Sequence, residues 1–218
     1  MEIGFSITDA LRVAYENMTR VEIWAVMAGL IYVILAAGEN IWCWLFGIIN
    51  SLLSIYLFYT GKLYSEAILY VYYVMAGVYG WYAWGQKNKN NIQVLDPSDA
   101  EKKDLKIHTW SVNSHLKAIA AGIAGAFLLA YLMAVYTDAK IPLMDAFTTI
   151  FSFIATYMVT RKVLENWLYW IVVDIVTTGM YYGRGYYLYA VLMIVYTVIA
   201  VFGYLKWRER YKKASATS

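Results

Sequence analysis

Apolar residues occur along this chain in seven long runs, each separated from the next by a polar break. The runs are roughly 17–25 residues long, which is the length that a helix needs to cross the hydrocarbon core of a bilayer. We therefore predict seven transmembrane helices, over residues 21–38, 41–60, 64–85, 116–136, 143–160, 164–182 and 186–207.

Three polar segments lie outside these runs. Residues 1–20 lack the positive start and short apolar core of a signal peptide, and they predict an N-terminal segment outside the membrane. Residues 86–115 are rich in Lys, Asp and Asn and hold one of the two prolines, which predicts a polar linker. Residues 208–218 predict a polar, frayed tail.

The basic residues are distributed unevenly between the two sides of the predicted helices. Seven crossings place the termini on opposite sides, and 13 of the 18 Lys and Arg residues then lie on the side of the C-terminus. Because short cytoplasmic loops carry an excess of Lys and Arg, we expect the linker and the C-terminus in the cytoplasm and the N-terminus outside.

The composition agrees with a membrane protein and gives little support to an enzyme. Hydrophobic residues make up 61% of the chain and charged residues 15%, against about a quarter charged in soluble domains. A single cysteine, Cys43, excludes an intramolecular disulfide and a cysteine-built metal site. We find no phosphate-binding loop, no paired nucleophile and base, and no basis for a cofactor, a metal ion or a nucleic-acid partner.

An internal repeat is visible at an offset of 123 residues. Residues 44–84 align without a gap onto residues 167–207, and eleven positions are identical. The identities include a Trp–Gly–Trp frame that consists of Trp44, Gly80 and Trp84 in the first unit and Trp167, Gly203 and Trp207 in the second.

The repeat predicts an architecture. Because the second and third helices match the sixth and seventh, one unit covers residues 21–85 and the other covers residues 143–207. The helix at 116–136 crosses alone and returns the chain, so that both units run in the same direction. The expected fold is an all-α integral membrane protein of seven transmembrane helices, arranged 3+1+3 with parallel repeats, as in SWEET-type transporters, which bind their solute between the repeats.

On two of the predicted helices, aromatic side chains share a face with one carboxylate, because they are spaced three, four or seven residues apart. These residues are Glu66, Tyr70 and Tyr73 on the third helix and Trp167, Trp170 and Asp174 on the sixth. An acid at the bilayer centre costs about 2.5–3.5 kcal/mol on insertion scales, so it needs a polar or wet environment. Asp174 lies close to the middle of its helix, whereas Glu66 lies near an end.

Three further residues complete the candidate substrate site. Trp44 opens the matching face of the second helix, Asn50 is a polar residue near mid-membrane, and Tyr196 is the repeat counterpart of Tyr73. Aromatic rings combined with carboxylates predict a flat, positively charged aromatic solute, held by stacking and cation–π contacts.

Each acid also has a purely structural interpretation. Asp174 could form a helix-packing hydrogen bond with Ser51, Asn50 or Thr177, which is a common use of polar groups between membrane helices. Glu66 could reach the membrane interface. The two interpretations remain open at this stage.

Five segments resemble those of the PnuC-type vitamin transporters of bacteria, and the similarity extends over about residues 21–207. The segments are "IWCWLFGIIN", "KLYSEAILYVYY", "YGWYAW", "TRKVLENWLYWIVVDI" and "YAVLMIVYTVIAVFGYLKW". The resemblance implies a carrier in the bacterial inner membrane that moves nicotinamide riboside by facilitated diffusion, with trapping by a cytoplasmic kinase. It also implies that the carrier can form homotrimers.

The resemblance leaves the vitamin open. Trp170 matches a tryptophan of the family's pocket, but Asp174 and Tyr70 stand where the family often has Asn and Gln, and Glu66 stands where a small residue is common. Thiamine, carried by some relatives, has a flat ring and a fixed positive charge, as nicotinamide riboside does. A thiamine carrier is therefore the main alternative, ahead of a proton-coupled carrier and a non-transporting sensor.

Overall fold

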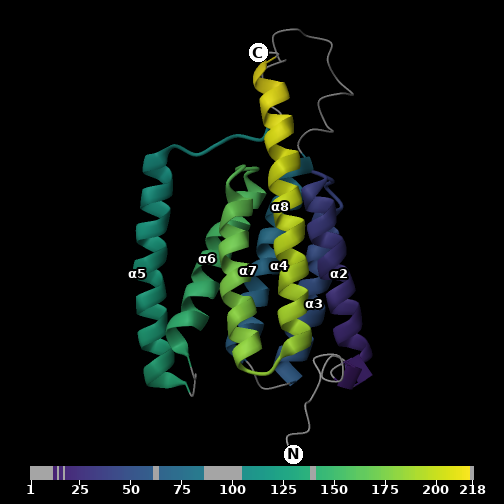
Figure 1. The fold of residues 1–218 in the computed structure, drawn as a ribbon, viewed down its shortest axis with the longest axis vertical. Coiled ribbons are helices and arrows are strands. Elements are labelled where there is room, and N and C mark those ends of the chain that lie inside the picture. Colours follow the sequence, from purple (N-terminus) through teal and green to yellow (C-terminus); the bar gives the residue numbers. More distant parts are fainter. Residues whose placement is uncertain are drawn as a thin grey trace, which may run out of the picture.

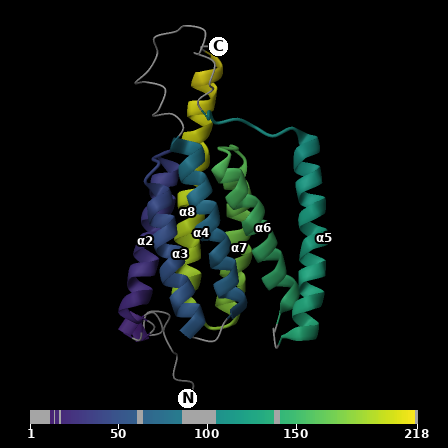
Figure 2. The same ribbon diagram turned by 180° about the vertical axis from the view of Figure 1, so that it is seen from behind.

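The computed structural model of this chain describes residues 12–13, 15–16, 18–60, 64–85, 105–137 and 141–216. These residues form seven helices of 18 residues or more, which stand side by side (Figures 1 and 2). The helices are α2 (Arg20–Ala37), α3 (Cys43–Thr60), α4 (Tyr64–Gly85), α5 (Val112–Tyr136), α6 (Pro142–Thr160), α7 (Asn166–Gly183) and α8 (Tyr187–Ala216).

The helices have the length and apolar character of membrane spans. Five of them, α2, α3, α5, α6 and α8, are long and apolar enough to cross a bilayer by themselves. The other two, α4 and α7, lie among them in the same bundle (Figure 1). The seven predicted helices are therefore confirmed. Below, the N-terminal end of the bundle is the end where α2 begins, and the C-terminal end is the end where α8 finishes.

The helices pack as two units of three. In sequence order, α2, α3 and α4 pack against one another, as do α6, α7 and α8. The units meet through two contacts, α4 against α6 and α8 against α2. Among the described residues α5 packs mainly on α6, with a further contact from His115 to Tyr169 of α7, and it stands at the edge of the molecule (Figure 2). This is the predicted 3+1+3 arrangement.

The repeat register found in the sequence holds in the structure. Helices α3 and α7 begin at Cys43 and Asn166, and α4 and α8 begin at Tyr64 and Tyr187, so both pairs are offset by the 123 residues of the sequence repeat. The duplicated unit thus begins its second and third helices at equivalent residues, although α8 runs further than α4 at its C-terminal end.

The loop after the first helix of each repeat has the same unusual backbone. Glu39 and its counterpart Lys162 both have φ of 54°, a left-handed conformation that is uncommon for residues other than glycine and that ends helices. In both loops the following residue donates its backbone N–H to a carbonyl five residues back, at 2.9 Å. The close match shows that the repeat includes α2 and α6, which sequence identity alone did not reveal.

Each repeat is held together by a tryptophan that lies over a glycine. Trp44 of α3 covers Gly80 of α4, so closely that a Cβ at Gly80 would overlap the indole ring. In the second repeat Trp167 covers Gly203, and a Cβ there would lie 2.8 Å from the ring. The bulky indole ring can lie against the neighbouring helix only because glycine has no side chain at these points.

The two repeats are joined through the remaining tryptophans of the frame. The indole N–H of Trp84 donates to the Thr160 carbonyl on α6, and that of Trp207 donates to the Ala36 carbonyl on α2, both at 3.2 Å. The rings of Trp84 and Trp207 are 6.1 Å apart. We call the four side chains the tryptophan layer; its members are Trp44, Trp84, Trp167 and Trp207.

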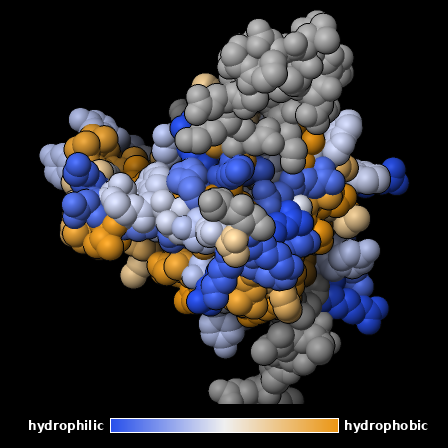
Figure 3. Space-filling model, turned by 90° about the horizontal axis from the view of Figure 1, so that it is seen from above, coloured by the Kyte–Doolittle hydropathy of each residue, from blue (hydrophilic) through white to orange (hydrophobic). Residues whose placement is uncertain are grey.

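An ion network closes the C-terminal end over this layer. The Glu39 carboxylate accepts from Lys162 at 2.9 Å and from Arg210 at 2.7 Å, so it links α8 to one loop of each repeat. The Lys162 ammonium also lies 4.7 Å from the centre of the Trp84 ring, a cation–π contact. Seen from this end, hydrophilic residues occupy much of the visible face and hydrophobic residues emerge at its flanks (Figure 3).

The polar linker is described in part. Residues 86–104 and most of the N-terminal segment lie outside the described residues. From residue 105 the linker runs along the loop between α6 and α7, where His108 donates its N–H to the Lys162 carbonyl at 3.2 Å and accepts from Leu164 at 2.8 Å. The end of the linker is thus fixed to the loop that carries the ion network.

Two predicted boundaries need correction. α5 begins at Val112 rather than 116, because the Ser111 side chain caps the first turn by accepting a backbone N–H. α8 continues to Ala216, through the segment predicted as a frayed tail. A pair of Lys213 with Glu209, 2.6 Å apart and four residues along the helix, supports this extension, as does the anchoring of Arg210 described above.

The tryptophan–glycine packing predicts a steric penalty. Gly80→Ala and Gly203→Ala should each lower the thermal stability of the detergent-solubilised protein, since overpacking typically costs about 1–3 kcal/mol. Gly179→Ala is the matched control, because a Cβ there meets nothing within 4 Å, and alanine favours the helix. Unfolding followed by tryptophan fluorescence measures the effect. Equal melting temperatures for all three variants would contradict the packing described here.

The ion network predicts a pH dependence of stability. Partial burial raises the pKa of the Glu39 carboxyl, but hydrogen bonds from Arg210 and Lys162 outweigh this, so the pKa lies below its ordinary value of 4.5. The stabilisation should therefore be complete above about pH 4.5 and disappear as the pH falls through the lower pKa of the folded state.

Melting temperatures of the wild type and of Glu39→Gln, measured between pH 7 and pH 3, test this. We expect a constant deficit for the variant above about pH 4.5 and a shrinking one below it. Glu209→Gln, which removes a fully exposed carboxylate, should leave the wild-type curve almost unchanged. Parallel curves for the wild type and Glu39→Gln over the whole range would overturn the assignment.

Candidate binding site

Asp174 places a carboxylate in the middle of the bundle. It lies near the centre of α7 with 6% of its surface exposed, and its repeat counterpart, Ser51 on α3, is also buried. Among the described residues Asp174 takes part in no ion pair. A buried charge is costly unless a partner compensates it, so the site favours a positively charged occupant.

The three polar residues considered as packing partners for Asp174 donate elsewhere. The hydroxyls of Ser51 and Thr177 each donate to a carbonyl four residues back along their own helix, at 2.8 Å. Asn50 donates to a carbonyl on α2 at 2.7 Å. A hydroxyl has a single hydrogen, so in this conformation neither Ser51 nor Thr177 donates to the carboxylate.

Two tyrosines from different repeats approach Asp174. The hydroxyls of Tyr73 on α4 and of Tyr196 on α8 both lie near it. The Tyr73 hydroxyl also lies near Ser152 on α6. The Tyr196 hydroxyl lies against α2 at Gly29, where a Cβ would be only 2.6 Å from the oxygen. Helices of both repeats therefore contribute to this site.

Asn50 belongs to the same group. Its amide nitrogen lies 3.2 Å from the position that a Cβ at Gly29 would occupy, next to the Tyr196 hydroxyl. One amide hydrogen is bonded to α2, and an amide offers a second hydrogen and a carbonyl oxygen for other contacts. The side chain thus lies beside the Tyr196 hydroxyl and has further hydrogen-bonding capacity.

Tyr70 lies one turn from Tyr73, toward the N-terminal end of the bundle. Its ring is 5.4 Å from that of Tyr73 and 5.3 Å from that of Phe58 on α3. Its hydroxyl is within hydrogen-bonding reach of Ser54. Tyr70 therefore covers the site from this side with an aromatic face.

The tryptophans of the predicted site lie at a different height along the bundle from Asp174. Trp44 and Trp167 are fully buried in the tryptophan layer, two helical turns from Ser51 and Asp174 toward the C-terminal end. Trp170 is partly buried and packs against the same layer. Among the described residues the indole N–H groups of Trp44 and Trp167 have no hydrogen-bond partner. Unpaired buried donors are costly, and these two N–H groups are therefore unusual.

Two residues beside the site were not predicted from the sequence, and one predicted site residue has a side chain that the structure does not describe. Gly29 and Ser152 carry no charge or ring, but an isolated glycine inside an apolar helix is a recognised signal of close approach. The side chain of Glu66 lies outside the described residues, and its role stays a prediction.

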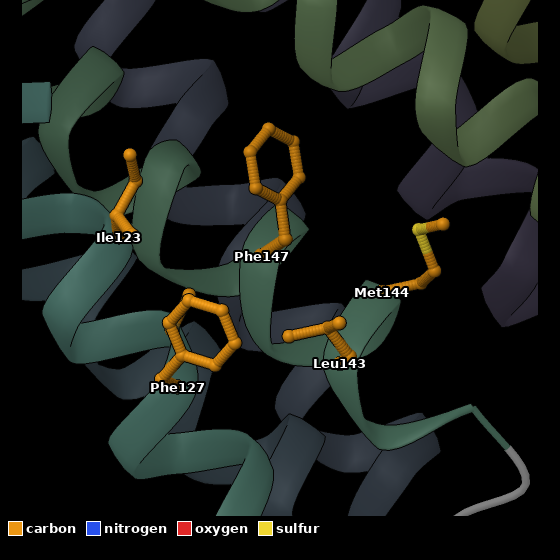
Figure 4. A pocket seen from close by; sticks show the side chains of 6 residues that line it. Ile123, Phe127, Leu143, Met144 and Phe147 are labelled. Carbon is orange, nitrogen blue, oxygen red and sulfur yellow. The ribbon is translucent and has the colours of Figure 1, made fainter.

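Asp174 is buried in this conformation, and two hollows lie elsewhere on the molecule. A hollow of about 240 Å³ lies at the surface between α5 and α6 and is lined by apolar side chains such as Phe127, Leu143 and Phe147 (Figure 4). A second hollow, of about 180 Å³, lies between α7 and α8. Neither is lined by Asp174. Among the described residues no three His, Cys, Asp or Glu side chains come together as metal ligands.

Comparison with known proteins places this arrangement in context. The chain is 28% identical to the nicotinamide riboside transporter PnuC of Escherichia coli (strain K12), an alignment that covers 91% of this chain and 90% of that protein. It is 25% identical to the riboflavin/roseoflavin transporter RibM of Streptomyces davaonensis, with 88% of each chain covered. It is also 25% identical to the PnuC protein of Neisseria mucosa, over 88% of this chain and 73% of that one.

A solved structure has the same fold. The crystal structure of the vitamin B3 transporter PnuC superposes with a TM-score of 0.70 and 23% sequence identity, over 95% of this chain and 90% of that one. The sequence profile of the nicotinamide mononucleotide transporter family matches residues 19–209. With nearly the whole membrane part matched, this multi-pass membrane protein belongs to the nicotinamide mononucleotide transporter family.

Proposed function

We propose that this protein takes up nicotinamide riboside across a bacterial inner membrane by facilitated diffusion. Two of the relatives described above are nicotinamide riboside transporters, and the similar crystal structure is that of a vitamin B3 transporter, which supports this substrate. The observation that carries the proposal is the Asp174 carboxylate, buried at the centre of the bundle without an ion-pair partner among the described residues.

The chemistry of nicotinamide riboside fits the groups at this level. Its flat pyridinium ring carries a permanent positive charge, which Asp174 neutralises in a medium where an unpaired charge is costly. The rings of Tyr73 and Tyr196 provide aromatic surface for the cation, and Asn50 provides an amide for the sugar hydroxyls. Each of these interactions is part of the proposal, and the burial of Asp174 in the centre of the bundle supports it.

Transport follows from movement of one repeat relative to the other. The repeats meet at the site, and toward the C-terminal end the tryptophan layer and the Glu39–Lys162 ion pair hold them together. Rocking that separates these contacts opens the site to the cytoplasm, and the reverse movement opens it to the outside. No energy source is needed when a cytoplasmic kinase phosphorylates the vitamin and keeps its free concentration low.

A homotrimer, with N-termini outside and C-termini in the cytoplasm, completes the proposal.

Thiamine is the second candidate substrate. It also combines a flat ring with a fixed positive charge, and its aminopyrimidine can donate to a carboxylate. The observation that favours it is the acid itself, since Asp174 stands where the family often has an amide. The relative that transports riboflavin shows that substrates differ among similar chains, but a neutral flavin would leave the carboxylate uncompensated.

Titration calorimetry on the purified protein, with nicotinamide riboside and thiamine in parallel, tests this assignment. Nicotinamide riboside should bind the wild type, and Asp174→Asn should weaken binding by about tenfold or more, because the variant keeps the shape but loses the charge that pairs with the ring. Glu209→Gln, which removes a surface carboxylate, is the control and should bind as the wild type does.

The outcomes separate the alternatives. Binding of thiamine alone would mean that the proposed substrate is wrong while the site is retained. Unchanged affinity in Asp174→Asn, with a normal melting temperature, would show that the carboxylate only packs and that the solute binds elsewhere.

A further inference from the structure

Three tyrosines face one another at the N-terminal end of the bundle, where α7 passes into α8. The ring centres of Tyr181 and Tyr189 are 5.8 Å apart, those of Tyr181 and Tyr186 are 6.3 Å apart, and those of Tyr186 and Tyr189 are 6.5 Å apart. The ring planes of the second and third pairs are nearly perpendicular, at 79° and 87°. We call these three side chains the tyrosine cluster.

A carboxylate from the other repeat completes this group. The Tyr189 hydroxyl donates to Oε1 of Glu22 on α2, at 3.3 Å. Glu22 also caps its own helix, with Oε2 accepting the backbone N–H of Thr19 at 2.6 Å. A carboxylate has about four acceptor positions, so these two bonds leave room for a further contact. The group therefore joins α7 and α8 to α2.

The basic residue in the same turn is already paired. The Arg184 guanidinium forms two hydrogen bonds with Asp145 at the start of α6, of 3.1 and 3.0 Å. The turn that carries the tyrosine cluster thus has its own positive charge neutralised, and the negative charge of Glu22 remains beside the three rings.

Aromatic side chains connect this group to the buried carboxylate. The Tyr70 hydroxyl lies near those of Tyr181 and Tyr189. The Tyr70 ring is 5.4 Å from that of Tyr73, whose hydroxyl lies in turn near Asp174. The opposite end is closed by the tryptophan layer and the ion network. A row of tyrosines therefore leads from the surface at the N-terminal end to the centre of the bundle.

We propose that the tyrosine cluster and Glu22 form an outer binding site for a cationic aromatic solute, which is captured there before it passes along Tyr70 to Asp174. Several aromatic faces around one position, together with an acid, are the arrangement that proteins use to bind organic cations. An acidic group near the opening also raises the local concentration of a cation and its rate of association. This inference rests on the proposed function, because it assigns the same solute to a second position.

Tyrosines at helix ends also anchor proteins in the membrane interface, and the chain contains a pair with that character. Tyr182 and Tyr187 lie at the same end with ring centres 5.5 Å apart, and Tyr182 is 61% exposed. The tyrosine cluster differs because its rings face one another, because Tyr189 is bonded to a carboxylate, and because Tyr181 and Tyr189 lie near Tyr70 further inside. Tyr182 therefore serves as the matched control for an anchoring role.

The test compares association rate with affinity, with nicotinamide riboside as the probe and the detergent-solubilised full chain as the protein. Stopped-flow quenching of tryptophan fluorescence gives the association rate constant, and calorimetry gives Kd. Glu22→Gln keeps the helix cap, since glutamine can replace glutamate in a capping box. Tyr186→Ala changes the most exposed ring of the cluster and leaves the core intact.

Both variants should slow association by about 3- to 10-fold and change Kd by less than about 2-fold, because an outer site speeds capture without stabilising the final complex. Tyr182→Ala should associate at the wild-type rate. Unchanged rates in both Glu22→Gln and Tyr186→Ala, or equal slowing in Tyr182→Ala, would overturn the outer site and leave the proposed function intact. Failure of the wild type to bind the probe would instead overturn the proposed function, and the outer site with it.

Discussion

The structure depends on two tryptophans that lie directly on glycines. Trp44 on Gly80 and Trp167 on Gly203 bring the second and third helices of each repeat close together at one level of the bundle. The same level carries the two indole hydrogen bonds between the repeats, and the Glu39–Lys162 ion pair lies above it. These contacts hold the repeats together at the C-terminal end of the bundle, and the proposed solute site lies in the tyrosine-lined region toward the N-terminal end.

This arrangement accounts for a carboxylate that is costly to bury. The tryptophan layer packs on one side of the site and Tyr70, Tyr73 and Tyr196 lie on the other, and among the described residues Asp174 has no ion-pair partner. The proposed solute carries the positive charge that would compensate this carboxylate. Closing around such a solute is then more favourable than closing around an empty site, which couples binding to the movement of the repeats.

Much of the fold follows from the sequence, because the length of apolar runs and the offset of 123 residues are both local properties of the chain. The position of the site along the length of the bundle is less predictable from the sequence. Asp174 can be predicted from its charge, and the tyrosine pair Tyr73 and Tyr196 from the repeat. Gly29 and Ser152 come close to the site through contacts between distant helices, which the periodicity of the sequence does not reveal. The placement of Trp44 and Trp167 in a separate layer was not predicted for a similar reason. Residues that share a helix face can still lie at different heights along the bundle.

In the proposed mechanism the two repeats carry a cationic vitamin passively through a site between them. The most direct measurement is flux of labelled nicotinamide riboside into sealed liposomes that contain the purified protein, with and without an imposed pH gradient. The account predicts saturable uptake that stops when the inner and outer concentrations are equal and that does not respond to the gradient. Absence of flux, or accumulation driven by the pH gradient, would contradict it.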